Sequence, residues 1–445
     1  MPSIPDTTTV TARVRRRSIA RLLAAGSLVL AVTIAGLGGL SSTANGKNTG
    51  KGSVTFAAFN PFSGVDASFG PEQMAGCLPA AHAIEAAGGI LGYKQVNCKP
   101  VDTRGDPADA VPAADQLIAT ASHLMGIVGP SSDEAAATVP LFNRAHIPMF
   151  ADTGLALYDK STYPYFYRII PADDVLGYAM ALFAHDQGYK RALGVFGNDV
   201  GSQSIAPTSA AGFKKLGGSF MLQTIQLDQS SYRSEIERAI RFKPQVILTE
   251  ADPQTSATYL AEFKQLYHMV PIIGSDATTQ PPWLKAVGGA IGHQNLNKYF
   301  TRAEPYAPTS GPAYAAWRKA LAAVAHQVEA PVSQWEADSY SMSYWDSINI
   351  MALAALEAKS IKPSVFNPYI VKVTQPKRGA VVVDTFAAGK AALASHKQIQ
   401  YVGAVGKITF DKYHNSPGLF EMVTSDGHAK VVFSAAQVNA VKNKR

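Results

Sequence analysis

Hydrophobic and polar positions follow one another along the chain in blocks that predict short buried strands separated by helices. Residues 54–59 and 126–129 are apolar runs of strand length, and residues 132–145 carry apolar side chains at helical spacing. The order strand, helix, strand, helix then begins again, with further strands predicted at 191–196 and 245–249. This rhythm predicts an α/β fold of two lobes, each built on a doubly wound parallel sheet.

Polar residues stand directly after several of the predicted strands. Ser131 and Ser132 follow the run at 126–129, and Thr153 follows the next predicted strand. In an open α/β sheet, ligands bind at the carboxyl ends of the strands, and a helix N-terminus at this edge favours an anionic group. The alternative is that Ser131 and Ser132 only cap the following helix, since serine is a common N-cap residue.

Two acidic residues stand at corresponding places in the second half of the chain. Glu250 follows the predicted strand at 245–249, and Asp276 follows the one at 271–274. A carboxylate at this edge can accept hydrogen bonds from a ligand ammonium, each contributing roughly 1.5–3 kcal/mol. The alternative for Asp276 is a structural role in the turn that precedes Pro281.

The amino terminus has the pattern of an export signal. Arginines between residues 13 and 21 precede an apolar run at 22–40, and the small residues at 42–44 fit a cleavage site. We therefore predict a signal peptide over residues 1–44 and a location outside the cytoplasm, in the periplasm, at the cell surface or secreted. The alternative is an uncleaved membrane anchor, because the apolar run approaches spanning length.

The net charge changes once this segment is set aside. The full chain has 40 basic and 33 acidic residues, and five of the arginines and one aspartate lie in residues 1–44. The remainder carries 35 basic and 32 acidic residues, a net charge of +3. So weak a balance does not indicate a nucleic-acid partner.

The chain has two cysteines, Cys77 and Cys98. A single pair in an exported protein favours a structural disulfide. There is no CxxC motif, and the histidines stand singly, without the spacing of metal ligands. The sequence thus predicts a disulfide, no metal and no cofactor.

Seven short segments give the mature chain a resemblance to a known family. They are AAGGILG (86–92), DTRGDP (102–107), GIVGPSS (126–132), IPMF (147–150), YRIIPADD (167–174), PIIGSD (271–276) and YVGAVGKITFD (401–411). In order and spacing, they resemble the type I periplasmic solute-binding proteins, of the branched-chain amino acid ABC-transporter class.

The resemblance implies two lobes joined by a hinge of three crossings, with a ligand cleft between them. Lobe one would take residues 53–171 and 297–414, and lobe two residues 172–296 and 415–440. Some members of the family carry a disulfide in the first lobe at the place where the two cysteines of this chain fall.

The resemblance also implies roles for the polar residues at the strand ends. In amino-acid-binding relatives, hydroxyls and backbone N–H groups of lobe one hold the ligand carboxylate, and an acidic residue of lobe two holds its ammonium. Ser131, Ser132, Thr153 and the backbone of Ala151 match the first role. Asp276 matches the second.

Other candidates for the pocket are less tightly specified. Glu250 is the rival acid, and Phe62 and Trp283 could wall the pocket, although aromatic residues at such positions are as often core. The chain departs from the family in the turn after Phe150, which looks shorter and brings Asp152 near the expected carboxylate site. An inward-facing Asp152 would repel a carboxylate. The ligand would then be an amide, an amine or a neutral compound.

The function that the resemblance implies is that of the extracytoplasmic solute-binding component of an ABC importer. Such a protein is no enzyme: it captures a small polar solute, an amino acid or an amide-like compound, by hinge closure and delivers it to an ABC permease, usually as a monomer. The same fold also serves in ligand-binding sensors for a membrane receptor or kinase. A secreted serine hydrolase using Ser131 or Ser132 is a remote alternative, because the chain has no G-x-S-x-G, HExxH or GK[ST] motif.

Overall fold

The computed structural model describes residues 51–425, 427 and 430–444, all of which belong to one compact unit. The predicted signal peptide at 1–44 lies outside the described residues. Within the part of the chain that is described, no helix is both long and apolar enough to cross a membrane.

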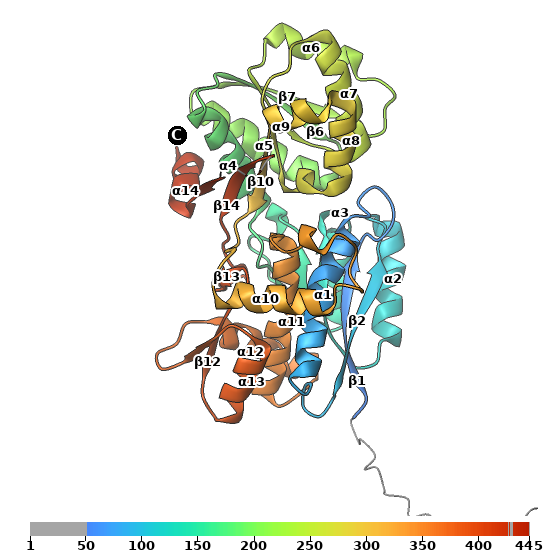
Figure 1. The fold of residues 1–445 in the computed structure, drawn as a ribbon, viewed down its shortest axis with the longest axis vertical. Helices are drawn as coiled ribbons and strands as arrows, with labels where there is room; N and C mark the ends of the chain where they lie inside the picture. The colour runs from blue at the N-terminus through green and yellow to red at the C-terminus, as the bar shows by residue number, and fades with distance from the viewer. Residues whose placement is uncertain (1–50, 426, 428–429, 445) are drawn as a thin grey trace, which may run out of the picture. The chain divides into compact units, whose positions relative to one another are not determined.

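The first lobe is built on a five-stranded parallel sheet with the strand order β2-β1-β3-β4-β5 (Figure 1). Its strands are β1 (Ser53–Asn60), β2 (Gln95–Asp102), β3 (Leu124–Ser131), β4 (Met149–Asp152) and β5 (Phe166–Tyr167). The helices between them are α1 (Phe69–Ala86), α2 (Pro107–Thr120) and α3 (Ser132–Arg144). The predicted parallel strand–helix order is therefore confirmed for this lobe.

Both faces of this sheet are covered, which explains the continuous apolar runs. In β1, Val54, Phe56 and Ala58 pack into a core with α1 and α11, while Ala57 and Phe59 face α2 and α3. Successive side chains of a strand point to opposite faces. A central parallel strand therefore needs apolar residues at every position rather than at every second one.

The second lobe is built on a seven-stranded sheet with the order β15-β14-β10-β9-β8-β6-β7. Its parallel strands are β6 (Arg191–Gly197), β7 (Ser219–Ile225), β8 (Val246–Glu250), β9 (Ile272–Gly274) and β10 (Phe300–Pro305). At one edge, β14 (Phe420–Thr424) runs antiparallel to β10, and β15 (Lys430–Phe433) runs antiparallel to β14. The helices of this lobe are α4 (Asp173–Asp186), α5 (Val200–Lys215), α6 (Arg233–Phe242), α7 (Pro253–Leu266), α8 (Pro281–Ile291), α9 (His293–Tyr299) and α14 (Ala435–Asn443).

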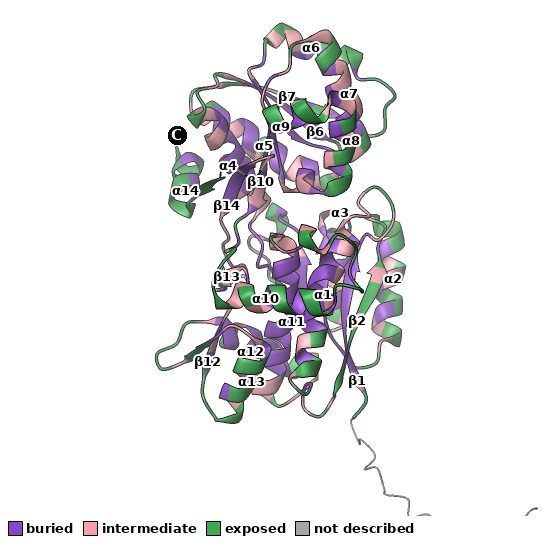
Figure 2. Cartoon of the chain, viewed as in Figure 1, coloured by how far each residue is buried: buried purple, intermediate pink, exposed green. Residues whose placement is uncertain are grey.

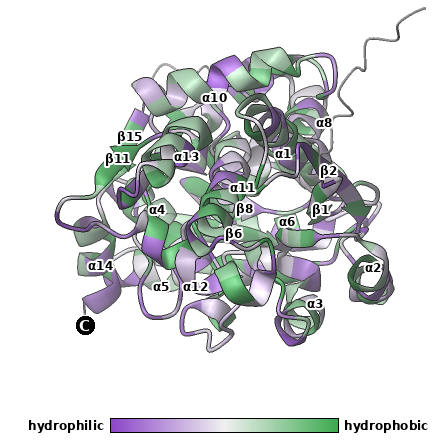
Figure 3. Cartoon of the chain, turned by 90° about the horizontal axis from the view of Figure 1, so that it is seen from below, coloured by the Kyte–Doolittle hydropathy of each residue, from purple (hydrophilic) through white to green (hydrophobic). Residues whose placement is uncertain are grey.

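The remaining segment, between β10 and β14, completes the first lobe. It contains α10 (Pro312–Ala323), α11 (Ser339–Ala358), α12 (Pro363–Thr374) and α13 (Phe386–Ala394), with a small sheet of β11 (Val381–Val383), β12 (Ile399–Gly403) and β13 (Gly406–Lys407). Figure 2 shows how deeply α11 is buried, and all of residues 341–355 are buried. Seen from below, α11 lies between α1 and α13, against both of which it packs (Figure 3).

The chain passes between the two lobes three times: between β5 and α4, between β10 and α10, and between β13 and β14. The boundary expected at residue 297 lies before the second of these crossings. Strand β10 pairs with β9 in the sheet of lobe two, from Phe300 against Ile272 onwards, so the chain leaves that lobe only after Pro305. The sequence pattern did not reveal this short strand, because its residues form neither a continuous apolar run nor a regular alternation of apolar and polar positions.

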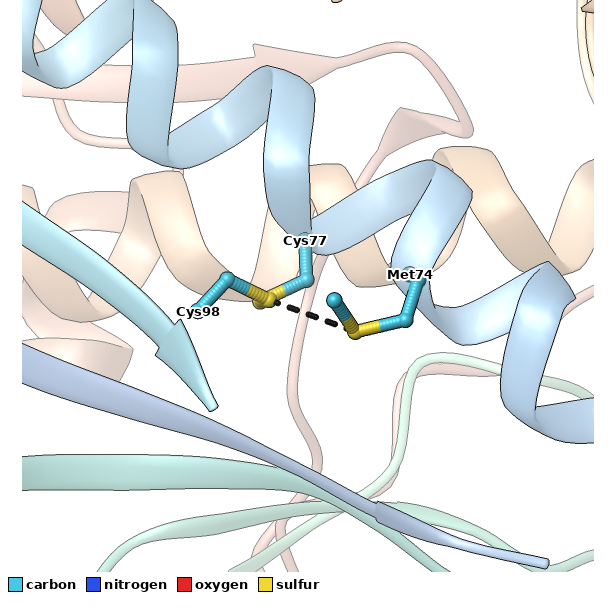
Figure 4. Close-up of a disulfide and its surroundings, with 3 residues drawn as sticks. All are labelled: Met74, Cys77 and Cys98. Carbon is cyan, nitrogen blue, oxygen red and sulfur yellow. Dashed lines mark hydrogen bonds between the residues drawn. A yellow bond between two sulfur atoms is a disulfide. The ribbon is translucent and has the colours of Figure 1, made fainter. Parts of the chain in front are cut away.

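A disulfide joins Cys77 of α1 to Cys98 of β2, as expected from the sequence, with 5.9 Å between their Cα atoms (Figure 4). The Sδ atom of Met74 lies 3.7 Å from Cys98 Sγ. The disulfide links β2, the edge strand of the first sheet, to α1, which covers that sheet.

Candidate ligand-binding site

A cavity of about 540 Å³ lies where the carboxyl ends of the two sheets meet. Ser131 and Asp152 line it from the ends of β3 and β4, and Glu250 lines it from the end of β8. Asp276 follows β9 and lines it as well. The cavity therefore occupies the edge at which open α/β sheets bind ligands, and its volume is in the range of small-molecule sites.

The serine and threonine hydroxyls of lobe one are mostly engaged with one another and with the helix end. Ser131 Oγ donates to Glu134 Oε2 at 2.7 Å, and the Ser131 backbone N–H donates to Glu134 Oε1 at 3.1 Å. Ser132 Oγ lies 3.0 Å from Thr153 Oγ1. Ser131 thus takes part in the capping of α3, while Ser132 lies on the cavity wall with its hydroxyl against Thr153.

The remaining lobe-one candidates lie away from the cavity wall. Thr153 is 1% exposed and sits behind Ser132, and Ala151 packs into the core with α2 and α3. Phe62 packs against the core around α1, with its ring so close to Gly70 that a Cβ there would overlap it.

The aromatic candidate of lobe two does lie on the cavity wall. Trp283 of α8 lines the cavity and donates its indole N–H to Ser256 Oγ at 3.0 Å.

Asp152 faces the cavity. Its carboxylate accepts hydrogen bonds from Asn60 Nδ2 at 3.0 Å and from the Tyr344 hydroxyl. Burial raises the pKa of Asp152 to about 6, although these two hydrogen bonds act in the opposite direction. The strand end after Phe150 thus puts an acid on the wall of the cavity, next to Thr153.

The two acids of lobe two occupy different surroundings. Glu250 is 7% exposed, and its Oε2 atom has no hydrogen-bond partner among the described residues. Burial, with the nearby charges of Asp276 and Asp199, raises the pKa of Glu250 well above its usual range, although the neighbouring Ser275 hydroxyl acts in the opposite direction. Asp276 accepts hydrogen bonds from the Tyr340 hydroxyl and, at 3.0 Å, from the Ala277 backbone N–H. Burial raises the pKa of Asp276 as well.

Hydrogen bonds join the two lobes across the cavity. Val200 N–H donates to Asp133 Oδ1 at 3.2 Å, and Gln280 Nε2 donates to Glu72 Oε1 at 2.8 Å. The bond from Tyr340 to Asp276 is a third connection, and all six residues line the cavity. The lobes are thus in direct contact around the space that a ligand would fill.

Sequence reasoning missed Glu72, Gln280 and Tyr340. They reach the cavity from α1, from the N-cap position before α8 and from α11, which are brought together by tertiary packing rather than by strand ends. A signal existed for Glu72, which lies on the buried face of a helix whose other buried positions are mostly small or apolar. A charged residue at such a position calls for a polar environment.

Comparison with known proteins assigns the chain to a family. A family model described as periplasmic binding protein matches residues 53–418. The chain belongs to the periplasmic binding protein family. This is a class of binding proteins rather than enzymes, which supports the prediction that the chain is no hydrolase. Comparison with curated protein sequences gives no significant match.

Solved structures of periplasmic binding proteins share this fold at low sequence identity. A leucine-binding protein from Thermotoga maritima is 18% identical, with a TM-score of 0.67 over 86% of this chain and 98% of its own. A branched-chain amino acid transporter substrate-binding protein from Streptococcus pneumoniae, in complex with isoleucine, is 18% identical, with a TM-score of 0.68 over 86% and 99%. A solute-binding protein of an ABC transporter from Rhodopseudomonas palustris, in complex with p-hydroxybenzoic acid, is 17% identical, with a TM-score of 0.66 over 86% and 97%.

Proposed function

We propose that this periplasmic binding protein is the extracytoplasmic solute-binding component of an ABC importer. It captures a small polar solute in the cavity between its lobes, closes over it at the three-crossing hinge, and delivers it to an ABC permease. The observation that carries the proposal is the cavity itself, which is bounded by strand ends of both sheets and bridged by hydrogen bonds between the lobes. Closure of two lobes around a ligand is the established motion of such hinged folds.

The roles of individual residues form part of this proposal. Ser132 and Asp152 contact the solute from lobe one, and Glu250 and Asp276 contact it from lobe two. The protein works as a monomer outside the cytoplasm, after export directed by residues 1–44. The ligands named for similar structures, isoleucine and p-hydroxybenzoic acid, support a small solute of this size.

A thermal-shift screen tests the proposal. The panel holds α-amino acids, amides, hydroxybenzoic acids and organic amines, each added to the purified protein. A solute present at a hundred times its dissociation constant stabilises the protein by roughly 2.7 kcal/mol, which raises the melting temperature. At least one member should do so. If no member of the panel raises the melting temperature, the proposed binding function is wrong for this range of solutes.

A further inference from the structure

We propose that the solute is a small organic cation with at least two positively charged N–H groups and no carboxylate, such as a diamine. This inference rests on the proposed function and names the class of ligand that the same cavity takes. It follows from the charge of the wall, from the buried atoms left without partners, and from the apolar side chains that share the wall with the acids.

All the charged side chains on the wall of the cavity are acidic. Ten of its lining residues are aspartate or glutamate, and none of the described residues that line it is lysine, arginine or histidine. Four of the ten are accounted for by helix ends. Asp106, Asp199 and Asp252 cap α2, α5 and α7, and Asp133 accepts a hydrogen bond from the first residue of α5. Backbone N–H groups at helix N-termini act to stabilise these charges, although burial and the charges of Asp199 and Glu134 still raise the pKa of Asp133 to about 6.

The other six acids do not cap an α-helix through a side-chain hydrogen bond, although Glu72 and Asp173 lie in the first turns of α1 and α4. The six are Asp66, Glu72, Asp152, Asp173, Glu250 and Asp276. Four of them accept hydrogen bonds from neutral side chains. Glu72 is bonded by Gln280 and Asp173 by Ser204, whereas Asp152 and Asp276 are bonded by tyrosine hydroxyls. Such partners orient a carboxylate without neutralising it. A cationic ligand would supply the missing charge.

The buried atoms that lack a partner point to the same chemistry. On the wall of the cavity these atoms are Glu250 Oε2, Gln280 Oε1 and Asp252 Oδ2, all of them hydrogen-bond acceptors. Glu250 and Gln280 are each only 7% exposed. Buried polar atoms are normally hydrogen-bonded. A ligand that brings N–H donors would complete these contacts, whereas a carboxylate would bring further acceptors.

The arrangement fits an organic cation better than a metal ion. Among the described residues, no three acidic, histidine or cysteine side chains are grouped so as to hold a metal. The wall also contains apolar side chains, including Ile170, Ile205, Leu227 and Trp283. A wall that combines acidic and apolar side chains complements a ligand in which a hydrocarbon chain carries charged amines.

The pKa values of the acids agree with a site made for a cation. Burial raises the pKa of Asp66 and Asp173 to about 7, and neighbouring carboxylates contribute to both shifts, although the Ser204 hydroxyl and the charge of Arg168 act in the opposite direction on Asp173. In the absence of a bound ligand, these groups are therefore partly protonated near neutral pH. A bound ammonium would favour their charged forms. Binding should accordingly release protons.

Isothermal titration calorimetry with three matched four-carbon probes tests the inference. The probes are 1,4-diaminobutane, 4-aminobutanoate, in which a carboxylate replaces one amine, and butane-1,4-diol, which has no charge. We expect 1,4-diaminobutane to bind at least tenfold more tightly than either of the others. Leucine and p-hydroxybenzoate are titrated alongside, as representatives of zwitterions and aromatic acids.

Two variants test whether 1,4-diaminobutane binds in the cavity. Glu250→Gln should weaken the binding of 1,4-diaminobutane at least tenfold, because it removes the carboxylate whose charged form a bound ammonium favours and keeps the shape of the side chain. Glu235→Gln is the matched control, since Glu235 is also in lobe two but pairs with Arg238 on α6, away from the cavity lining. It should leave the affinity unchanged, and the melting temperature of each variant checks its folding.

The outcomes separate this inference from the proposed function. Tight binding of leucine, p-hydroxybenzoate or 4-aminobutanoate without binding of the diamine would overturn the cationic ligand and leave the solute-binding function standing. If both variants lowered the affinity for 1,4-diaminobutane equally, the diamine would bind outside the cavity, and the inference would also be overturned. Failure of all five probes to bind would contradict the inference and count against the proposed function.

Discussion

At the scale of single residues, the site is best tested at Asp276. We expect Asp276→Ala to weaken solute binding by about 2–4 kcal/mol, or roughly 30- to 1000-fold, because it removes a charged partner from a closed, poorly hydrated cavity. Calorimetry with the best solute from the screen measures this change. Glu357→Ala is the control, since Glu357 pairs with Lys372 in lobe one and is not part of the cavity wall. A change of less than threefold at Asp276 would remove its assigned role.

The residue scale also shows where sequence reasoning works and where it stops. Acids that end strands, such as Glu250 and Asp276, could be placed at the ligand edge, because a parallel sheet gathers its carboxyl ends. Ser131 shows the limit, because the same residue type serves as helix cap and as ligand donor. Its hydroxyl donates a hydrogen bond to Glu134. Whether the hydroxyl bonds to Glu134 or to a ligand depends on side-chain geometry, which the sequence does not give.

At the scale of elements, the cap of α3 gives a prediction about stability. We expect Ser131→Ala to lower the free energy of unfolding by about 1 kcal/mol, because the bonds between Ser131 and Glu134 fasten the first turn of the helix. Urea denaturation measures it. Solute affinity should change less than threefold, since Ser132 keeps its place on the wall. A large loss of affinity with unchanged stability would reverse this assignment and make Ser131 a ligand donor.

The bond between α1 and β2 gives a second prediction at this scale. Replacing Cys77 and Cys98 together by serine should lower the free energy of unfolding by about 2–4 kcal/mol, because the disulfide limits the unfolded chain. Denaturation with and without a reducing agent provides the comparison. The reducing agent should destabilise the parent protein and leave the double variant unaffected. Equal stability of parent and variant under oxidising conditions would show that the bond contributes nothing.

The elements that sequence reasoning could not place are those fixed by long-range packing. The strand–helix order of lobe one was readable because the central strands β1 and β3 are buried along almost their whole length and a helix follows each of them. Strand β10 could not be predicted from the sequence, because it is recognisable only by its pairing with β9 and β14. The contributions of α1 and α11 to the cavity depend in the same way on how these helices pack together.

At the scale of the whole molecule, the acidic cavity makes stability depend on pH. Asp66, Asp152 and Asp173 have pKa values of about 6 to 7 in the folded protein, raised from 3.8 mainly by burial. Groups with raised pKa values bind more protons in the folded than in the unfolded state, so the stability they contribute falls as pH rises from about 4 to 7. The ligand-free protein should melt at a lower temperature at pH 8 than at pH 5.

Most of the other titratable groups around the cavity act in the same direction. Glu72, Asp133, Glu134, Glu250 and Asp276 also have raised pKa values and act in the same direction. The lowered pKa of Asp102, outside the cavity wall, acts in the opposite direction. A saturating cation should therefore raise the melting temperature more at pH 8 than at pH 5. A melting temperature that increases from pH 5 to pH 8 without ligand would contradict the account.

The whole-molecule claim is that one solute is held by both lobes at once. A crystal structure of the protein with the solute that gives the largest rise in melting temperature tests it most directly. We predict density for the solute within the cavity, in contact with Ser132 or Asp152 on one side and with Glu250 or Asp276 on the other. Density on the outer surface, or contacts with one lobe only, would contradict the proposed function.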